Sequence, residues 1–108
     1  MINVTFYKDS SHDYKGFKLS GHAGYAESGK DIVCAAVSIL VINFINSVET
    51  YTDDKFDLKQ NEKKGLMDFN FSGDISNESK LLMNSLILGI TGIYDENEQY
   101  IQIFFKEV

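Results

Sequence analysis

A run of apolar residues between positions 32 and 48 constrains the fold of this chain more than any other feature of its sequence. The run is about as long as the ~17-residue lower limit for a helix that spans a membrane. Polar residues nevertheless interrupt it, at Ser38, Asn43, Asn46 and Ser47. We therefore expect a buried helix over residues 32–51, amphipathic in its second half, rather than a membrane helix.

The residues before this helix alternate between apolar and polar, which is the pattern of strands with one buried face. Residues 2–8 and 14–22 alternate in this way, and a polar turn over residues 10–13 joins them. His22 is the last residue of the second predicted strand. We therefore expect its side chain at the point where a strand ends and a loop begins.

The rest of the chain predicts a hairpin, a second helix and a last strand. In chain order these are strands at 55–61 and 66–72 around a turn at 61–65, a helix capped by Ser76 or Asn77 that runs to about Tyr94, and a strand at 99–106. The resulting order, ββαββαβ, favours an α+β sandwich in which a mixed sheet packs on two helices in two layers. No linker or proline-rich hinge divides the chain, so we expect residues 1–108 to form a single domain.

Composition and charge exclude several classes of function. The net charge is −6 and no basic stripe is present, which argues against nucleic-acid binding. The first residues lack the charged start and long apolar stretch of a signal peptide. One cysteine cannot form a disulfide within the chain or a multi-cysteine metal site. A reducing, cytoplasmic location is therefore expected.

The strongest chemical signal lies between the second predicted strand and the first helix. Asp31 is suited to cap that helix, and Cys34 would then lie in its first turn, where the helix dipole lowers a thiol pKa. His22 precedes a glycine loop and can fold back toward Cys34 as its general base. The backbone amides of the same turn offer an oxyanion hole. This segment alone can therefore supply a nucleophile, a base and oxyanion donors.

Each of these residues also has a purely structural explanation. Taken alone, Cys34 is more often a buried inert thiol, His22 a surface residue and Asp31 only a helix cap. Ser38 lies one turn after Cys34, where its hydroxyl either contacts the site or bonds back to the helix. His12 is a weaker candidate base, because its polar turn predicts a solvated side chain.

The loop between His22 and the helix contains small and polar residues, with glycines that permit tight turns. We expect it to fold over a bound peptide. Its expected substrate-facing residues are Gly24, Tyr25, Ser28 and Gly29. Glu27, in the same loop, is a candidate for orienting His22.

This segment resembles the Prp family, the ribosomal-processing cysteine proteases of Firmicutes and related bacteria. The family motif is Gly-His-Ala, a short glycine-containing loop, and then Asp-[Ile/Val]-Val-Cys-Ala-x-x-Ser. Both halves occur here, at residues 21–23 and 31–38. The chain length and the order of elements agree with the family throughout. Ser28 is a departure, since family members often carry tyrosine at that position.

The resemblance implies that His22 and Cys34 form a catalytic dyad, with Asp31 and Ser38 in supporting roles toward the oxyanion or the substrate. It implies a homodimeric protein that needs no metal or organic cofactor. The implied substrate is large-subunit ribosomal protein number twenty-seven. Its short N-terminal extension would be removed after an aromatic residue so that ribosomes can assemble.

Three other functions remain open. A non-catalytic, ribosome-associated peptide-binding module would bind its peptide intact and would not need Cys34. A redox sensor would depend on a disulfide between two molecules, because the chain has no second cysteine. A thiol transferase acting on a small molecule is conceivable, but the sequence has no phosphate-binding glycine motif.

Overall fold

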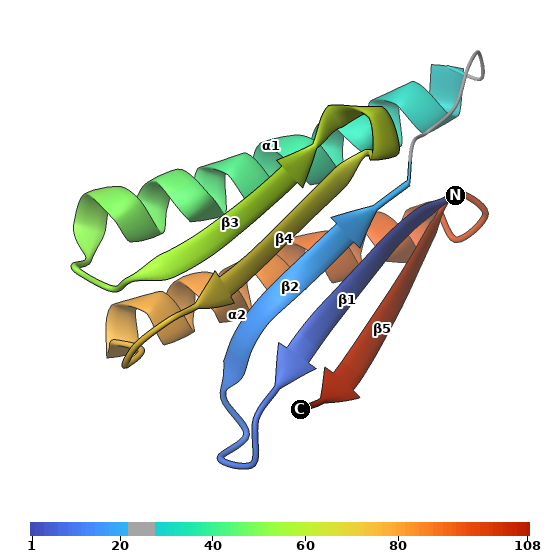
Figure 1. Ribbon diagram of the computed structural model, residues 1–108. Helices are drawn as coiled ribbons and strands as arrows, with labels where there is room; N and C mark the ends of the chain where they lie inside the picture. Colours follow the sequence, from blue (N-terminus) through green and yellow to red (C-terminus); the bar gives the residue numbers. More distant parts are fainter. Residues whose placement is uncertain (22–27) are drawn as a thin grey trace.

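The structure, a computed structural model, describes residues 1–21 and 28–108, and for residues 28–31 it describes the backbone alone. Its elements follow the predicted order ββαββαβ (Figure 1). They are β1 (Ile2–Lys8), β2 (Tyr14–Ser20), α1 (Ser28–Tyr51), β3 (Phe56–Asn61), β4 (Leu66–Phe71), α2 (Asn77–Glu96) and β5 (Ile101–Glu107), with a short 3-10 helix, η1 (Glu62–Lys64), between β3 and β4.

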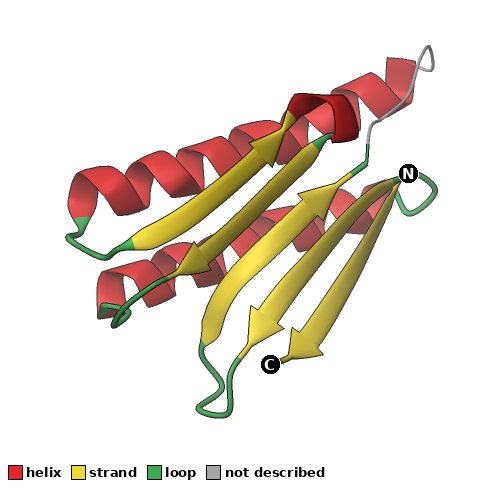
Figure 2. Cartoon of the chain, viewed as in Figure 1, coloured by secondary structure: helices red, strands yellow, loops and turns green. Residues whose placement is uncertain are grey.

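The strands form one mixed sheet in the order β3-β4-β2-β1-β5. The β1–β5 pair is parallel, and the other neighbouring pairs of this sheet are antiparallel. Both helices cover the same face of the sheet, so the molecule has two layers (Figure 2). The α+β sandwich predicted from the sequence is therefore confirmed.

The core lies between the sheet and the helices. On β1 the side chains of Ile2, Val4 and Phe6 are buried at every second position, as the alternation predicts. In the middle of the sheet Phe17 stacks on Phe69, with ring centroids 5.3 Å apart. Aromatic rings from neighbouring strands thus fill the interior on which the helices pack.

Helix α1 is long and apolar enough to cross a membrane by length and composition over Ile32–Tyr51. One stripe of it is buried against the sheet, however: Val33, Val37, Val41, Phe44, Ile45 and Val48. This spacing of three or four residues is that of a core-facing helix. The expectation of a buried helix is met on this face, while Ile32 and Ile39 on the other side are 69% and 67% exposed.

The start of α1 differs from the prediction. The helix begins at Ser28, so residues 28–31 form its first turn and Asp31 is not its N-cap. Cys34 consequently lies in the second turn, not the first. An acidic residue is favoured by the helix dipole inside the first turn as well as at the cap, so Asp31 alone could not fix where the helix begins. The free amides of the helix start belong to residues 28–31, and the amide of Cys34 lies among the hydrogen-bonded turns.

Candidate active site

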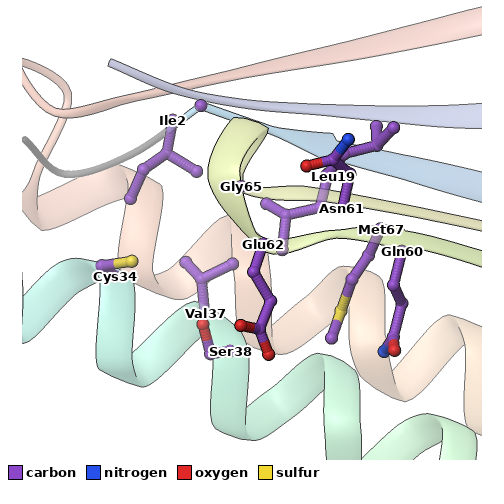
Figure 3. A pocket seen from close by; sticks show the side chains of 12 residues that line it. Ile2, Leu19, Cys34, Val37, Ser38, Gln60, Asn61, Glu62, Gly65 and Met67 are labelled. Atoms are coloured by element: carbon purple, nitrogen blue, oxygen red, sulfur yellow. The ribbon is translucent and has the colours of Figure 1, made fainter.

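Cys34 lies at the edge of a pocket between α1 and the end of the β3–β4 hairpin (Figure 3). Its thiol is free and half-buried, and it packs against the core. The pocket has a volume of about 250 Å³. It is lined by Cys34, Val37 and Ser38 of α1, by Gln60, Asn61, Glu62, Gly65, Leu66 and Met67 of the hairpin, and by Ile2, Leu19 and Gly21.

The pocket is apolar in its depth and polar at its mouth. Ile2, Leu19 and Val37 are almost completely buried and form its inner wall. Polar side chains from the hairpin and the Ser38 hydroxyl line the outer part. A cavity of this kind binds an apolar side chain and leaves polar groups to contact the backbone around it.

Ser38 is placed as the helical spacing predicts, on the same face of α1 as Cys34 and in the same pocket. Its side chain is half-buried. Among the described residues it makes no hydrogen bond back to the helix, so that alternative is not observed. The hydroxyl is therefore available to a molecule bound beside Cys34.

The hairpin wall of the pocket was not anticipated from the sequence as part of the site. The Asn61 side chain accepts a hydrogen bond from the Lys64 amide at 3.3 Å, and Gly65 takes the left-handed conformation with φ 58°. The Gly21 amide donates to the Lys64 carbonyl at 3.3 Å and ties this turn to the end of β2. Local sequence predicts the hairpin but cannot show that its tip lies opposite Cys34.

Several predicted site residues fall outside the described residues. These are His22, Gly24, Tyr25 and Glu27. Strand β2 ends at Ser20, two residues earlier than predicted, and Gly21 lines the pocket. Ser28, Gly29 and Asp31 belong to the first turn of α1. The structure thus brings Cys34 and Ser38 together, and the pairing of Cys34 with His22 stays a prediction.

His12 does not belong to this site. It lies in the β1–β2 turn with φ 64°, and its amide donates to the Asp9 carbonyl at 3.0 Å. This turn precedes β2, whereas the pocket is lined by Leu19 and Gly21 at the other end of that strand. The interpretation of His12 as a solvated turn residue is the one that this position supports.

The groups with displaced pKa values, among the residues that the structure describes, lie away from the pocket. Burial raises the pKa of Tyr7, and the Asp68 carboxylate adds to the rise. Burial also acts to raise the pKa of Asp54. Hydrogen bonds from Ser76 lower this pKa by more, and the nearby Ser79 hydroxyl lowers it further. The pKa of Asp54 therefore lies below its usual value. The oxygen of Ser79 has no hydrogen-bond partner within bonding distance, so the Ser76 contacts dominate.

No group of three or more His, Cys, Asp or Glu side chains with the geometry of a metal site occurs in residues 1–21 and 28–108.

Known proteins share both the sequence pattern and the fold of this chain. The family model described as cysteine protease Prp matches residues 1–102. The ribosomal processing cysteine protease Prp of Bacillus subtilis is 30% identical over 90 residues, which cover 83% of this chain and 80% of that protein. Its counterpart from Staphylococcus aureus is 24% identical over 88 residues, or 82% and 83% of the two chains.

Solved structures agree. The crystal structure of SMU.848 from Streptococcus mutans is 31% identical, with a TM-score of 0.86 and coverage of 100% and 96%. The S. aureus protease with a covalently linked product peptide has a TM-score of 0.89 at 23% identity, and covers 98% of this chain and 100% of its own. Because the S. aureus structure is only 23% identical, its similarity supports the fold alone.

A half-buried thiol on a helix, beside a pocket in a two-layer α+β sandwich with this family match, defines a cysteine protease. Within that class, the chain belongs to the Prp family.

Proposed function

We propose that this protein removes a short N-terminal extension from large-subunit ribosomal protein number twenty-seven, cutting after an aromatic residue. The observation that carries the proposal is the pocket that opens directly beside the one thiol of the chain. The B. subtilis and S. aureus relatives are named ribosomal processing cysteine proteases, which supports a ribosomal substrate. We propose that this processing takes place in the cytoplasm.

In this proposal Cys34 attacks the scissile carbonyl as a thiolate and forms an acyl-enzyme. His22, the expected base, takes the thiol proton and gives it to the leaving amine, and water then releases the acyl group. Ser38 contacts the substrate or the oxyanion from within the pocket. Asp31 supports the site from the first turn of α1, where Ser28 and Gly29 also lie rather than in the loop that the sequence predicted. The loop residues Gly24 and Tyr25 close over the peptide.

The pocket is suited to one side chain of the substrate rather than to a whole peptide. Its volume of about 250 Å³ lies below the ~300 Å³ at which pockets for drug-sized ligands begin. An aromatic side chain is flat and apolar, and it would lie against Leu19, Val37 and Met67. We expect this contact to select the aromatic residue at the cleavage point.

The test is mass spectrometry of the N-terminal peptide of the ribosomal protein after incubation with the wild type, Cys34→Ala and His22→Ala. We expect cleavage after an aromatic residue by the wild type and intact peptide with both variants. Circular dichroism of the variants controls for loss of folding. An intact peptide with all three folded proteins would instead support a non-catalytic peptide-binding module.

We also propose that the protein is a homodimer. The helix layer leaves large apolar side chains exposed on both helices: Ile32, Ile39, Ile42, Leu81 and Leu88. Apolar groups gathered on one surface favour association. Sedimentation of the wild type should give twice the monomer mass, and Ile39→Lys combined with Leu88→Lys should give the monomer. A wild type that stays monomeric at high micromolar concentration would contradict the proposal.

A further inference from the structure

Glu62 is the one acidic or basic side chain among the described residues that line the pocket. It is the first residue of η1, at the tip of the β3–β4 hairpin. In Figure 3 its side chain extends from the hairpin toward α1, on the side where Ser38 lies. A carboxylate therefore stands at the mouth of a pocket whose depth is apolar.

The backbone that carries Glu62 is held in place by three independent contacts. Its carbonyl accepts a hydrogen bond from the Gly65 amide at 3.1 Å. The preceding residue, Asn61, caps η1, and the Gly21 amide donates to Lys64 at the end of the same turn. The position of the carboxylate relative to Cys34 is thus set by the fold, and the side chain needs only to choose a rotamer.

The carboxylate itself has no partner in the described part of the chain. No hydrogen bond or ion pair engages its oxygens, although Lys63 and Lys64 follow it in the turn. Neither lysine lines the pocket. This carboxylate is carried on a held backbone beside an apolar pocket, and no described side chain pairs with it. Such an arrangement attracts a cation on whatever occupies the pocket.

We propose that Glu62 is a specificity-determining residue that selects peptides with a lysine or arginine close to the aromatic residue in the pocket. The inference rests on the proposed protease function and adds a second recognition element to it. The apolar pocket would take the aromatic side chain, while the Glu62 carboxylate would pair with the basic side chain at the mouth. This contact would leave the proposed reaction at Cys34 unchanged.

The test uses a set of peptides that share one aromatic residue. Each peptide carries a single lysine at one of the three positions on either side of that residue, and matched peptides carry glutamine, as the reference, or glutamate there. For the wild type, kcat/KM should be about two- to fivefold higher with lysine at one or more positions, the range expected of an exposed ion pair. Glu62→Gln should lose this preference, and Glu62→Lys should reverse it toward glutamate peptides. Glu49→Gln, which removes an exposed carboxylate from the far part of α1, should keep it.

Two further measurements separate this inference from the protease function. The preference should shrink as salt rises, because exposed ion pairs are screened. Binding of the same peptides to Cys34→Ala, measured by fluorescence anisotropy, reports on Glu62 even if the wild type cleaves nothing. Lysine and glutamine peptides that bind and react equally, or a preference that survives in Glu62→Gln, would overturn the role of Glu62. Cleavage that depends on Cys34 would still stand in that case.

Discussion

Cys34 differs from an inert core thiol because it also lines a pocket. One side of the residue packs on the core, and the other faces a pocket with a hydroxyl one turn away. The sequence predicts Cys34 and Ser38 together because helical spacing fixes their relation. It could not predict Glu62 or Met67 as neighbours, because the contact of the hairpin with α1 is tertiary.

Asp54 provides a test of electrostatics at the scale of one residue. Its carboxylate accepts from the Ser76 amide at 2.9 Å and from the Ser76 hydroxyl at 2.7 Å, just where Ser76 caps α2. Asp54→Asn should lower the free energy of unfolding by about 1 kcal/mol near neutral pH, since a charged acceptor is lost. Asp53→Asn, at an exposed neighbour, is the matched control and should change little.

The effect of Asp54 should depend on pH in a defined direction. Its pKa in the folded protein is lowered from the usual 3.8, so the folded state binds this proton less readily than the unfolded state. The stabilisation is therefore fully present above about pH 4–5 and is lost as the pH falls through the folded-state pKa. Urea unfolding of the wild type and Asp54→Asn between pH 3 and pH 7 should show two curves that converge in acid. A difference that stays constant would contradict this assignment.

Among the elements, the ones best predicted are those whose pattern is complete within a few residues. Strand β1 and the β3–β4 hairpin occur where alternation and the turn at 61–65 place them. Ser76 caps α2, one of the two residues considered for that position. The start of α1 was placed too late, because a good capping residue also fits inside a first turn.

The contact between the helices predicts different outcomes for two glycines of α2. A Cβ at Gly92 would meet no atom within 4 Å, whereas a Cβ at Gly89 would lie 2.8 Å from Leu40 Cδ1. Gly92→Ala should therefore raise the free energy of unfolding by about 0.5–1 kcal/mol through helix propensity. Gly89→Ala should raise the free energy of unfolding clearly less, because the Leu40 side chain has to move to make room for the new methyl group. Equal gains by urea unfolding would show that the helices tolerate a wider separation.

For the molecule as a whole, the site is assembled from segments far apart in the chain. The inner wall comes from Ile2 and Leu19, and the opposite wall comes from residues 60–67. The proposed nucleophile, Cys34, comes from α1. The fold class could be predicted from the sequence because each element buries one face, and this requirement is local. The pocket could not be found in that way, since one of its walls is the hairpin tip, which is placed by tertiary contacts such as the hydrogen bond from the Gly21 amide to the Lys64 carbonyl.

Strand β1 lies between β2 and β5, so the first strand of the chain pairs with the last one in the sheet. Ile2 pairs with Ile101, and closing so long a loop costs entropy before the pairing returns any stability. The chain has no proline, which removes the usual source of slow refolding phases. Refolding followed by tyrosine fluorescence should therefore be a single exponential. If β1–β5 closure sets its rate, Ile101→Val should slow folding and leave the unfolding rate nearly unchanged.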